Sequence, residues 1–231
     1  MELGTATMRT PNKSAPAIVQ VCVDVPFIEE ALAVAEMAAR AGVDWFEAGT
    51  PLILFSGIPV IKPFASALPG RTVFADIKIV DGARKYVVAA AAQGAHIVTV
   101  CGVASDASIR EAVAGAREAG IQVCVDLFAT PDPVKRAREA VDMGADLVYL
   151  HYGGDQRAAN PDGDRTLELI PLVRQVVDVP LGVVTFDTSR GVAAVEAGAD
   201  IVLIGHPYVT GPNAEEMLTD YVRQVRSAVR A

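Results

Sequence analysis

The side chains best suited to chemistry are Asp76, Lys78 and Asp81, in the segment FADIKIVD at residues 74–81. Residues two apart on an extended strand point to the same face, so the Asp76 carboxylate and the Lys78 ammonium are expected side by side. A lysine between carboxylates stays protonated and forms a fixed cation that can stabilise negative charge developing on a substrate. Asp81 follows where the predicted strand gives way to a loop. The segment therefore predicts a reaction that passes through an anion.

A repeated phrase indicates which elements position this segment. Gly42, Gly94, Gly144 and Gly198 each follow an alanine-rich stretch of helical period and precede a short apolar run rich in β-branched residues. This pattern is typical of a helix that ends at a C-cap glycine and leads into a buried strand. Further apolar runs lie between these repeats. Together they predict eight strands, beginning near residues 17, 43, 72, 96, 121, 146, 181 and 200.

Eight strands alternating with helices predict a single-domain (β/α)₈ TIM barrel over residues 15–231, preceded by a flexible N-terminal extension at residues 1–14. Such barrels take about 200–250 residues, which the chain's 231 residues match. The predicted strands are almost continuously apolar, as expected of parallel strands covered on both faces. An open doubly wound sheet is disfavoured, because no Gly-x-Gly-x-x-Gly loop follows the first strand.

The composition restricts the partners of the chain. Its formal charge is −8, with no run of Lys and Arg, which argues against nucleic acid. Hydrophobic residues make up 52% of the chain, yet the longest apolar stretches are about ten residues, half of the ~20 that a membrane helix needs. The N-terminus carries no apolar targeting segment. We therefore expect a cytoplasmic protein that acts on a small molecule, with Cys22, Cys101 and Cys124 as buried free thiols.

In a (β/α)₈ barrel the active site lies at the C-terminal ends of the strands. Burying carboxylates there costs several kcal/mol unless they are paired or bind a cation, which favours a functional cluster over chance. The open alternative for any one residue is a solvent-facing group or a helix cap, and Asp126 fits either description. The residues predicted at these strand ends are Asp24, Glu47, Asp76 with Lys78, Cys101, Asp126, His151, Thr185, and Gly205 with His206.

Three segments resemble the orotidine 5′-phosphate decarboxylase superfamily, which is marked by Asp-x-Lys-x-x-Asp after the third strand. Residues 76–81 carry that motif. Residues 47–53 (EAGTPLI) and 151–156 (HYGGDQ) are similar to phrases of the branch containing 3-hexulose-6-phosphate synthase and 3-keto-L-gulonate-6-phosphate decarboxylase, with the Gln of the second phrase one place early. The decarboxylase usually has an Arg where this chain has Gly154, so the synthase is the nearer match.

The resemblance implies a magnesium-dependent carbon–carbon lyase, in which Glu47 and Asp76 hold Mg²⁺. Lys78 would add positive charge to an enediolate of ribulose 5-phosphate, and His151 would move the proton at carbon one. Asp24 would orient Lys78 and the substrate hydroxyls. In the synthase this enediolate attacks formaldehyde. In the decarboxylase a similar enediolate forms as carbon dioxide leaves.

The resemblance also implies a homodimer with shared active sites, because Asp81 reaches into the partner's site in this superfamily. Two departures concern the phosphate end of the substrate. The family places a Gly-Gly pair after strand seven, where this chain has residues 185–187 (TFD), and an Arg after strand eight, where it has His206. We expect Thr185, Gly205 and His206 to contact substrate there, and ribulose 5-phosphate to bind weakly.

These departures leave three alternatives to a synthase. The first is an enzyme similar to the decarboxylase, which Gly154 disfavours. The second is a divergent member that acts on a different or non-phosphorylated substrate. The third is a non-catalytic barrel that binds a ligand, and it is disfavoured because the Asp-x-Lys-x-x-Asp motif, Glu47 and His151 are all retained.

Overall fold

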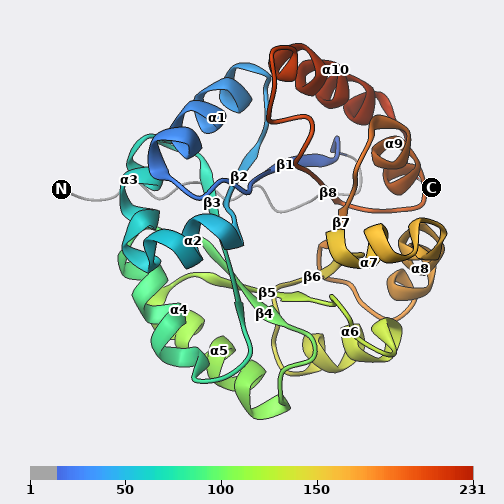
Figure 1. Cartoon of the computed structure of the whole chain (residues 1–231). Coiled ribbons are helices and arrows are strands. Elements are labelled where there is room, and N and C mark those ends of the chain that lie inside the picture. The colour runs from blue at the N-terminus through green and yellow to red at the C-terminus, as the bar shows by residue number, and fades with distance from the viewer. Residues whose placement is uncertain (1–14, 231) are drawn as a thin grey trace.

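The computed structural model describes residues 15–230, so the extension predicted for residues 1–14 lies outside the described residues. Within this range eight parallel strands close into a barrel, in which each strand pairs with its neighbours in chain order (Figure 1). Each strand begins within two residues of its predicted start, so the predicted (β/α)₈ barrel is confirmed. The strands are β1 (Ile18–Val23), β2 (Trp45–Ala48), β3 (Thr72–Ile79), β4 (Ile97–Cys101), β5 (Gln122–Asp126), β6 (Leu147–Leu150), β7 (Leu181–Val184) and β8 (Ile201–Ile204).

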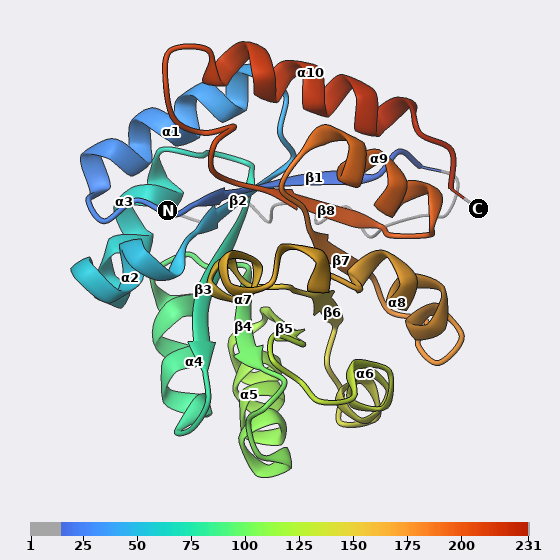
Figure 2. The same cartoon turned by 45° about the vertical axis from the view of Figure 1, so that its right-hand side comes forward.

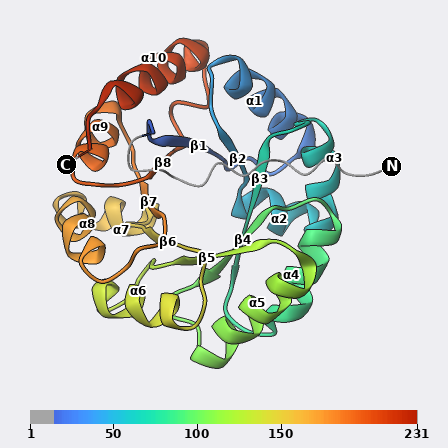
Figure 3. The same cartoon turned by 180° about the vertical axis from the view of Figure 1, so that it is seen from behind.

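Helices surround the barrel as an outer ring, which Figures 1 and 3 show from opposite sides. The repeated glycines adopt the positive φ that ends a helix, from 89° at Gly42 to 109° at Gly198. None of the helices in residues 15–230 is long and apolar enough to cross a membrane. The ring consists of α1 (Ile28–Arg40), α3 (Ile61–Ser66), α4 (Ala83–Ala92), α5 (Asp106–Ala119), α6 (Pro133–Asp142), α8 (Thr166–Arg174), α9 (Thr188–Glu196) and α10 (Ala214–Ser227).

Two short helices, α2 (Thr50–Ser56) and α7 (Gly154–Ala159), follow β2 and β6. They lie inside the outer ring in Figures 1 and 2, close to the ends of the strands that precede them. Each is followed by a single 3₁₀ turn, η1 (Ile58–Val60) and η2 (Pro161–Gly163) respectively. The two short helices therefore stand at the end of the barrel where chemistry is expected.

Side chains alternate along each strand between the helix layer and the barrel interior. The interior is filled by a separate cluster of buried side chains that includes Trp45, Phe74 and Cys124. The same inward alternation continues toward the C-terminal ends, where Asp76 follows Phe74 and Asp126 follows Cys124. The strand faces that pack in the barrel interior thus carry ionisable side chains at their C-terminal ends, which form the mouth of the barrel.

Tyr149 forms the floor between the packed interior and the mouth. Its ring stacks on Phe74 with 5.3 Å between centroids, and its hydroxyl donates to Oε1 of Gln20 at 2.7 Å. A Cβ added at Gly182 would lie 2.2 Å from this ring. Only glycine fits at that place in β7, because the Tyr149 ring occupies the space that a side chain would need.

Candidate active site

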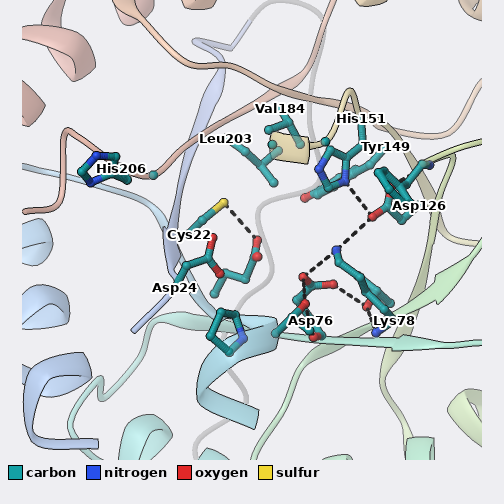
Figure 4. A pocket seen from close by; sticks show the side chains of 18 of the residues that line it. Cys22, Asp24, Asp76, Lys78, Asp126, Tyr149, His151, Val184, Leu203 and His206 are labelled. Carbon is teal, nitrogen blue, oxygen red and sulfur yellow. Dashed lines mark hydrogen bonds and ion pairs between the residues drawn. The ribbon is translucent and has the colours of Figure 1, made fainter. Parts of the chain in front are cut away.

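A cavity of about 510 Å³ opens at the C-terminal ends of the strands (Figure 4), within the range of roughly 300–1,000 Å³ common for small-molecule sites. Of the residues predicted from the sequence, Asp81 and Cys101 do not line it. The predicted residues that line the cavity are Asp24, Glu47, Asp76, Lys78, His151, Thr185, Gly205 and His206.

Asp76 and Lys78 lie on a bulge and not on a regular strand. Between Ala75 and Ile79 β3 advances four residues while β4 advances only two, and Lys78 takes a positive φ of 51°. The expected proximity of the two side chains is therefore confirmed, but the strand that carries them is not regular as expected. The bulge turns Lys78 toward the cavity, where its ammonium pairs with Oδ2 of Asp76 at 2.8 Å.

Two threonines fix the Asp76 carboxylate. Thr50, at the start of α2, donates to Oδ2 at 2.5 Å, and Thr99 of β4 donates to Oδ1 at 2.8 Å. Thr99 also accepts the backbone N–H of Lys78 at 2.9 Å, in place of a regular ladder bond. Sequence reasoning missed both threonines. The polar Thr99 inside an otherwise apolar strand was the available signal.

Asp126 links the lysine to the histidine. Its Oδ2 lies 3.3 Å from Nζ of Lys78 and 2.9 Å from Nδ1 of His151, as the dashed lines of Figure 4 show. Its Oδ1 accepts the backbone N–H of Phe128 at 3.0 Å. Asp24 was expected to orient Lys78, but the hydrogen bonds to this lysine come from Asp76 and Asp126. The sequence left Asp126 open between a site partner and a helix cap, and the structure makes it a site partner.

The charges of Lys78, Asp126 and their partners stabilise one another. Burial by itself would lower the pKa of Lys78, but Asp76 and then Asp126 outweigh it and raise that pKa above its usual range. Burial would likewise raise the pKa of Asp126, but His151 and Lys78 outweigh it and lower the pKa. Lys78 is therefore a permanent cation and Asp126 a permanent anion near neutral pH.

Glu47 is the most deeply buried carboxylate of the site apart from Asp126, with 4% of its surface exposed. The Gln20 side-chain amide donates to its Oε2, and the Cys22 thiol lies 3.5 Å from the same oxygen. Both internal donors thus reach Oε2, which leaves Oε1 for a ligand. Burial, followed by repulsion from Asp76, raises the pKa of Glu47 well above its usual value. Among residues 15–230 no lysine, arginine or histidine forms an ion pair with this carboxylate.

Asp24 stands at the end of β1 and opens onto the cavity (Figure 4). Although solvent reaches its side chain, surrounding protein desolvates it, and this effect, followed by repulsion from Asp76, raises its pKa. A Cβ at Gly49 would lie 2.1 Å from Oδ1 of Asp24 and 2.6 Å from the carbonyl oxygen of Val23. Gly49 therefore lets the end of β2 approach this carboxylate.

At the β7 and β8 side Thr185 lines the cavity as expected, but its hydroxyl is already bonded within the protein. The Thr185 hydroxyl donates to the carbonyl of Leu203 at 2.7 Å and lies 2.8 Å from the Tyr221 hydroxyl, and its N–H also bonds Leu203. Its donor groups are thus occupied, so a donor role for Thr185 toward substrate does not fit this geometry. Gly205 and His206 line the cavity as expected. His206 is solvent exposed, with Nδ1 2.8 Å from the Thr210 hydroxyl.

Donor groups in the first turn of α9 already have hydrogen-bond acceptors within the protein. Asp187 caps the helix by accepting the Arg190 N–H at 2.8 Å, and it accepts the Ser189 hydroxyl at 2.6 Å. The Thr188 N–H points to the Tyr208 hydroxyl at 3.2 Å. Asp187 does not line the cavity. Burial by itself would raise its pKa, but the hydrogen bonds from Ser189 and Arg190, followed by the charges of Arg190 and then Arg157, lower that pKa.

Asp81 is exposed in the loop after β3 and lines a separate surface hollow beside the starts of α4 and α5. It takes no part in the cavity of its own chain. Its expected contribution to a partner's site stays a prediction.

The three cysteines are free and buried, as predicted. Burial raises the pKa of Cys22 and Cys124 well above the usual thiol value, and it raises that of Cys101 to about 11. These thiols stay protonated near neutral pH and do not supply a nucleophile.

Comparisons with known proteins show which family this chain resembles over most of its length. The model of the orotidine 5′-phosphate decarboxylase / HUMPS family matches residues 17–219. The 3-hexulose-6-phosphate synthase 3 of Staphylococcus saprophyticus subsp. saprophyticus is 36% identical over 192 residues, covering 80% of this chain and 88% of that protein.

Solved structures give the same result. A crystal structure of 3-hexulose-6-phosphate synthase superposes with a TM-score of 0.83 at 32% identity, covering 92% of this chain and 99% of that one. The 3-keto-L-gulonate-6-phosphate decarboxylase of Vibrio cholerae shares the fold, with a TM-score of 0.81 at 19% identity over 93% of this chain and 99% of that one. The chain belongs to the orotidine 5′-phosphate decarboxylase / HUMPS family.

Proposed function

We propose that the protein acts as a 3-hexulose-6-phosphate synthase: it adds formaldehyde to ribulose 5-phosphate through an enediolate of the ketose. The chain is a carbon–carbon lyase of the aldehyde-lyase type. The observation that carries the proposal is the continuous series from Asp76 through Lys78 and Asp126 to His151, with contacts of 2.8, 3.3 and 2.9 Å. This series places a permanent cation between a buried carboxylate and a base.

His151 is the group that moves the proton. Because the Asp126 carboxylate can only accept, Nδ1 of His151 carries a hydrogen and Nε2 is the basic nitrogen. Nε2 takes the proton from carbon one of the ketose, and the electron pair left behind forms the enediolate. That carbon then bonds to the carbon of formaldehyde, and the aldehyde oxygen receives the proton from His151. Lys78 stabilises the negative charge between these two steps.

The donor set fits Mg²⁺. Glu47 leaves Oε1 unused by the protein, and its raised pKa reflects a buried negative charge without a cation. Among residues 15–230 no three His, Cys, Asp or Glu side chains converge as a metal site. Mg²⁺ suits this arrangement, because it usually takes one or two carboxylates and keeps water or substrate oxygens. Glu47 and Asp76 would hold the ion, which would supply Lewis-acid polarisation of the ketose carbonyl.

The test separates the proton step from the aldol step. Ribulose 5-phosphate in D₂O without formaldehyde should lose its carbon-one hydrogen, seen by proton NMR, in the wild type and not in His151→Gln. Addition of formaldehyde should then give a hexulose 6-phosphate. Both reactions should stop with EDTA and return with Mg²⁺. Exchange and product formation that persist fully in EDTA would contradict the metal role, and release of carbon dioxide from a 3-keto sugar acid phosphate would favour the decarboxylase.

A homodimer with shared sites is part of the proposal. Asp81 is exposed beside Val80, whose surface is 56% exposed, and α2 exposes Leu54 and Phe55 by 76% and 73%. Large apolar side chains at such exposure support an interface. If Asp81 acts across it, mixing the inactive Asp81→Ala and Lys78→Ala variants should restore activity in hybrid dimers that keep one intact site. A monomer in light scattering, without such rescue, would contradict the proposal.

A further inference from the structure

The cavity has a shortage of positive charge for a phosphorylated substrate. Among residues 15–230, the only lysine or arginine in its lining is Lys78, and that ammonium is already paired with two carboxylates. A phosphate monoester brings a further charge of about −1.5 to −2 at neutral pH. A cation from outside the lining is therefore needed to hold such a group. The five carboxylates of the lining are Asp24, Glu47, Asp76, Asp126 and Asp155.

The backbone of α9 does not fill this gap. In many (β/α)₈ barrels the loops after strands seven and eight and a helix N-terminus bind phosphate. Here two N–H groups in the first turn of α9 already have acceptors. The Arg190 N–H donates to Asp187 at 2.8 Å, and the Thr188 N–H donates to the Tyr208 hydroxyl at 3.2 Å. Arg190 itself is tied to Asp164 at 2.6 Å. An anion at this end of the cavity must find another side chain.

Arg157 supplies a cation at the β7 side of the cavity. Its guanidinium carbon lies 4.2 Å from the ring centroid of Phe186, and Phe186 lines the cavity on the β7 side. Arg157 belongs to α7, which lies beside β7 in Figures 1 and 2. Among residues 15–230 no carboxylate lies within ion-pair distance of this guanidinium. Stacking on a ring leaves the N–H edge of an arginine available for a bidentate contact with phosphate.

We propose that Arg157, held against Phe186, is the specificity-determining residue that binds the terminal phosphate of the substrate. The inference rests on the proposed function, which supplies a ketose phosphate. The reacting groups lie on β2, β3, β5 and β6, so the far end of the substrate reaches the β7 side, where Phe186 supports the guanidinium. The arginine acts on binding and not on the proton or the new carbon–carbon bond.

The test compares Arg157→Met with Arg138→Met, which removes one charge from the exposed face of α6. Losing a bidentate, charge-assisted contact should raise the KM for ribulose 5-phosphate about ten- to a hundredfold, with kcat changed less than about threefold. Arg157→Met should prefer ribulose 5-phosphate over ribulose less than the wild type does, by the same factor. Phe186→Leu should raise the same KM by a smaller factor, because it removes the surface on which Arg157 rests. Arg138→Met should match the wild type.

Calorimetric titration with ribulose 5-phosphate in the absence of formaldehyde gives a readout independent of the aldol step. Weaker binding by Arg157→Met, with ribulose binding unchanged, supports the inference even if the wild type forms no hexulose phosphate, and in that case only the proposed function fails. Equal KM and equal binding in Arg157→Met and in the wild type would overturn the inference, and aldol activity in the wild type would then leave the proposed function standing.

Discussion

The two halves of the cavity rim are built in different ways. The half from β2 to β6 is a connected set of charges, in which Lys78 and Asp126 are held at both ends by ion pairs and hydrogen bonds. The half formed by β7 and β8 presents Val184, Phe186 and Leu203, and no acid or base within it is tied into that set (Figure 4). In the proposed function, the first half sets the type of reaction and the second half sets the choice of substrate.

The two departures noted in the sequence, at residues 185–187 and at His206, both fall on the second half. Removing the charge of Lys78 or of Asp126 leaves a buried partner unpaired, and the cost in stability exceeds what a single new hydrogen bond would supply. On the second half Val184 and Leu203 make apolar contacts and His206 is exposed, so these side chains can vary without such a penalty. A different substrate can be selected there while the reaction stays the same.

The largest expected effect is that of Lys78→Met. This change removes the only lining cation among the described residues and leaves Asp76 and Asp126 without their shared partner. We expect kcat to fall by about 10³ or more, since preorganised charge at a developing anion is commonly a large part of catalysis. Lys135→Met, on the exposed face of α6, is the matched control. A loss below about tenfold would mean that the charged half does not set the reaction.

Asp126→Asn should lower kcat by about 10², because His151 loses the acceptor that fixes its basic nitrogen. It should also change the dependence of stability on pH. The native pKa of Asp126 is lowered, so its stabilising contribution is present above the unfolded value of about 3.9 and is lost as the pH falls through the native pKa. Urea unfolding should therefore separate wild type from variant at pH 7, and the difference should shrink below pH 4.

Glu47→Gln should abolish activity and yet stabilise the metal-free protein. The native pKa of Glu47 is raised, so in EDTA the wild type loses stability as the pH rises from the unfolded value toward the native one. The amide removes that loss. We expect Tm at pH 7.5 in EDTA to rise by several degrees, at about 2–4 °C for each kcal/mol in a chain of this size.

Glu36→Gln on the exposed side of α1 is the control for this stability change, and it should leave Tm unchanged. Adding Mg²⁺ should close the gap in Tm, because the ion binds only the wild type. A lower Tm for Glu47→Gln in EDTA would show that the carboxylate already has a sufficient partner within the chain.

The smallest effect tests the other half of the rim. His206→Arg places a guanidinium at the β8 side of the cavity, where His206 is exposed and bonded only to Thr210 among the described residues. We expect the KM for ribulose 5-phosphate to fall about three- to tenfold at unchanged kcat. A variant equal to the wild type in kcat/KM would show that this side already binds phosphate fully.

The sequence predicts the barrel well and the site in part. Repeated glycines and apolar runs depend on short-range rules, so every strand start could be located. Glu47, Asp76 and His151 could be placed because each ends a predicted strand. The hydrogen bonds that hold Thr185 within the protein could not be predicted, because its partner Tyr221 comes from α10, and no local pattern reports that contact.

Supporting residues were harder to predict, since their roles depend on pairs far apart in the sequence. Asp126 acts on Lys78 across 48 positions, and Gln20 acts on Glu47 across 27. Two signals were present nevertheless. Asp126 follows the inward-facing Cys124 by two residues, and Gln20 is a polar residue on the inward face of a strand that is otherwise apolar.

The bulge in β3 has a consequence for anyone who would transplant this chemistry. Because four residues of β3 span the distance of two residues on β4, an Asp and a Lys grafted onto a regular strand of another barrel would be aimed differently. The graft must carry residues 75–79 as a block, with the left-handed Lys78, and also Thr99 from the neighbouring strand to receive its N–H. Residues 75–79 and Thr99 must therefore be transferred together, because two point substitutions do not reproduce the backbone of the bulge.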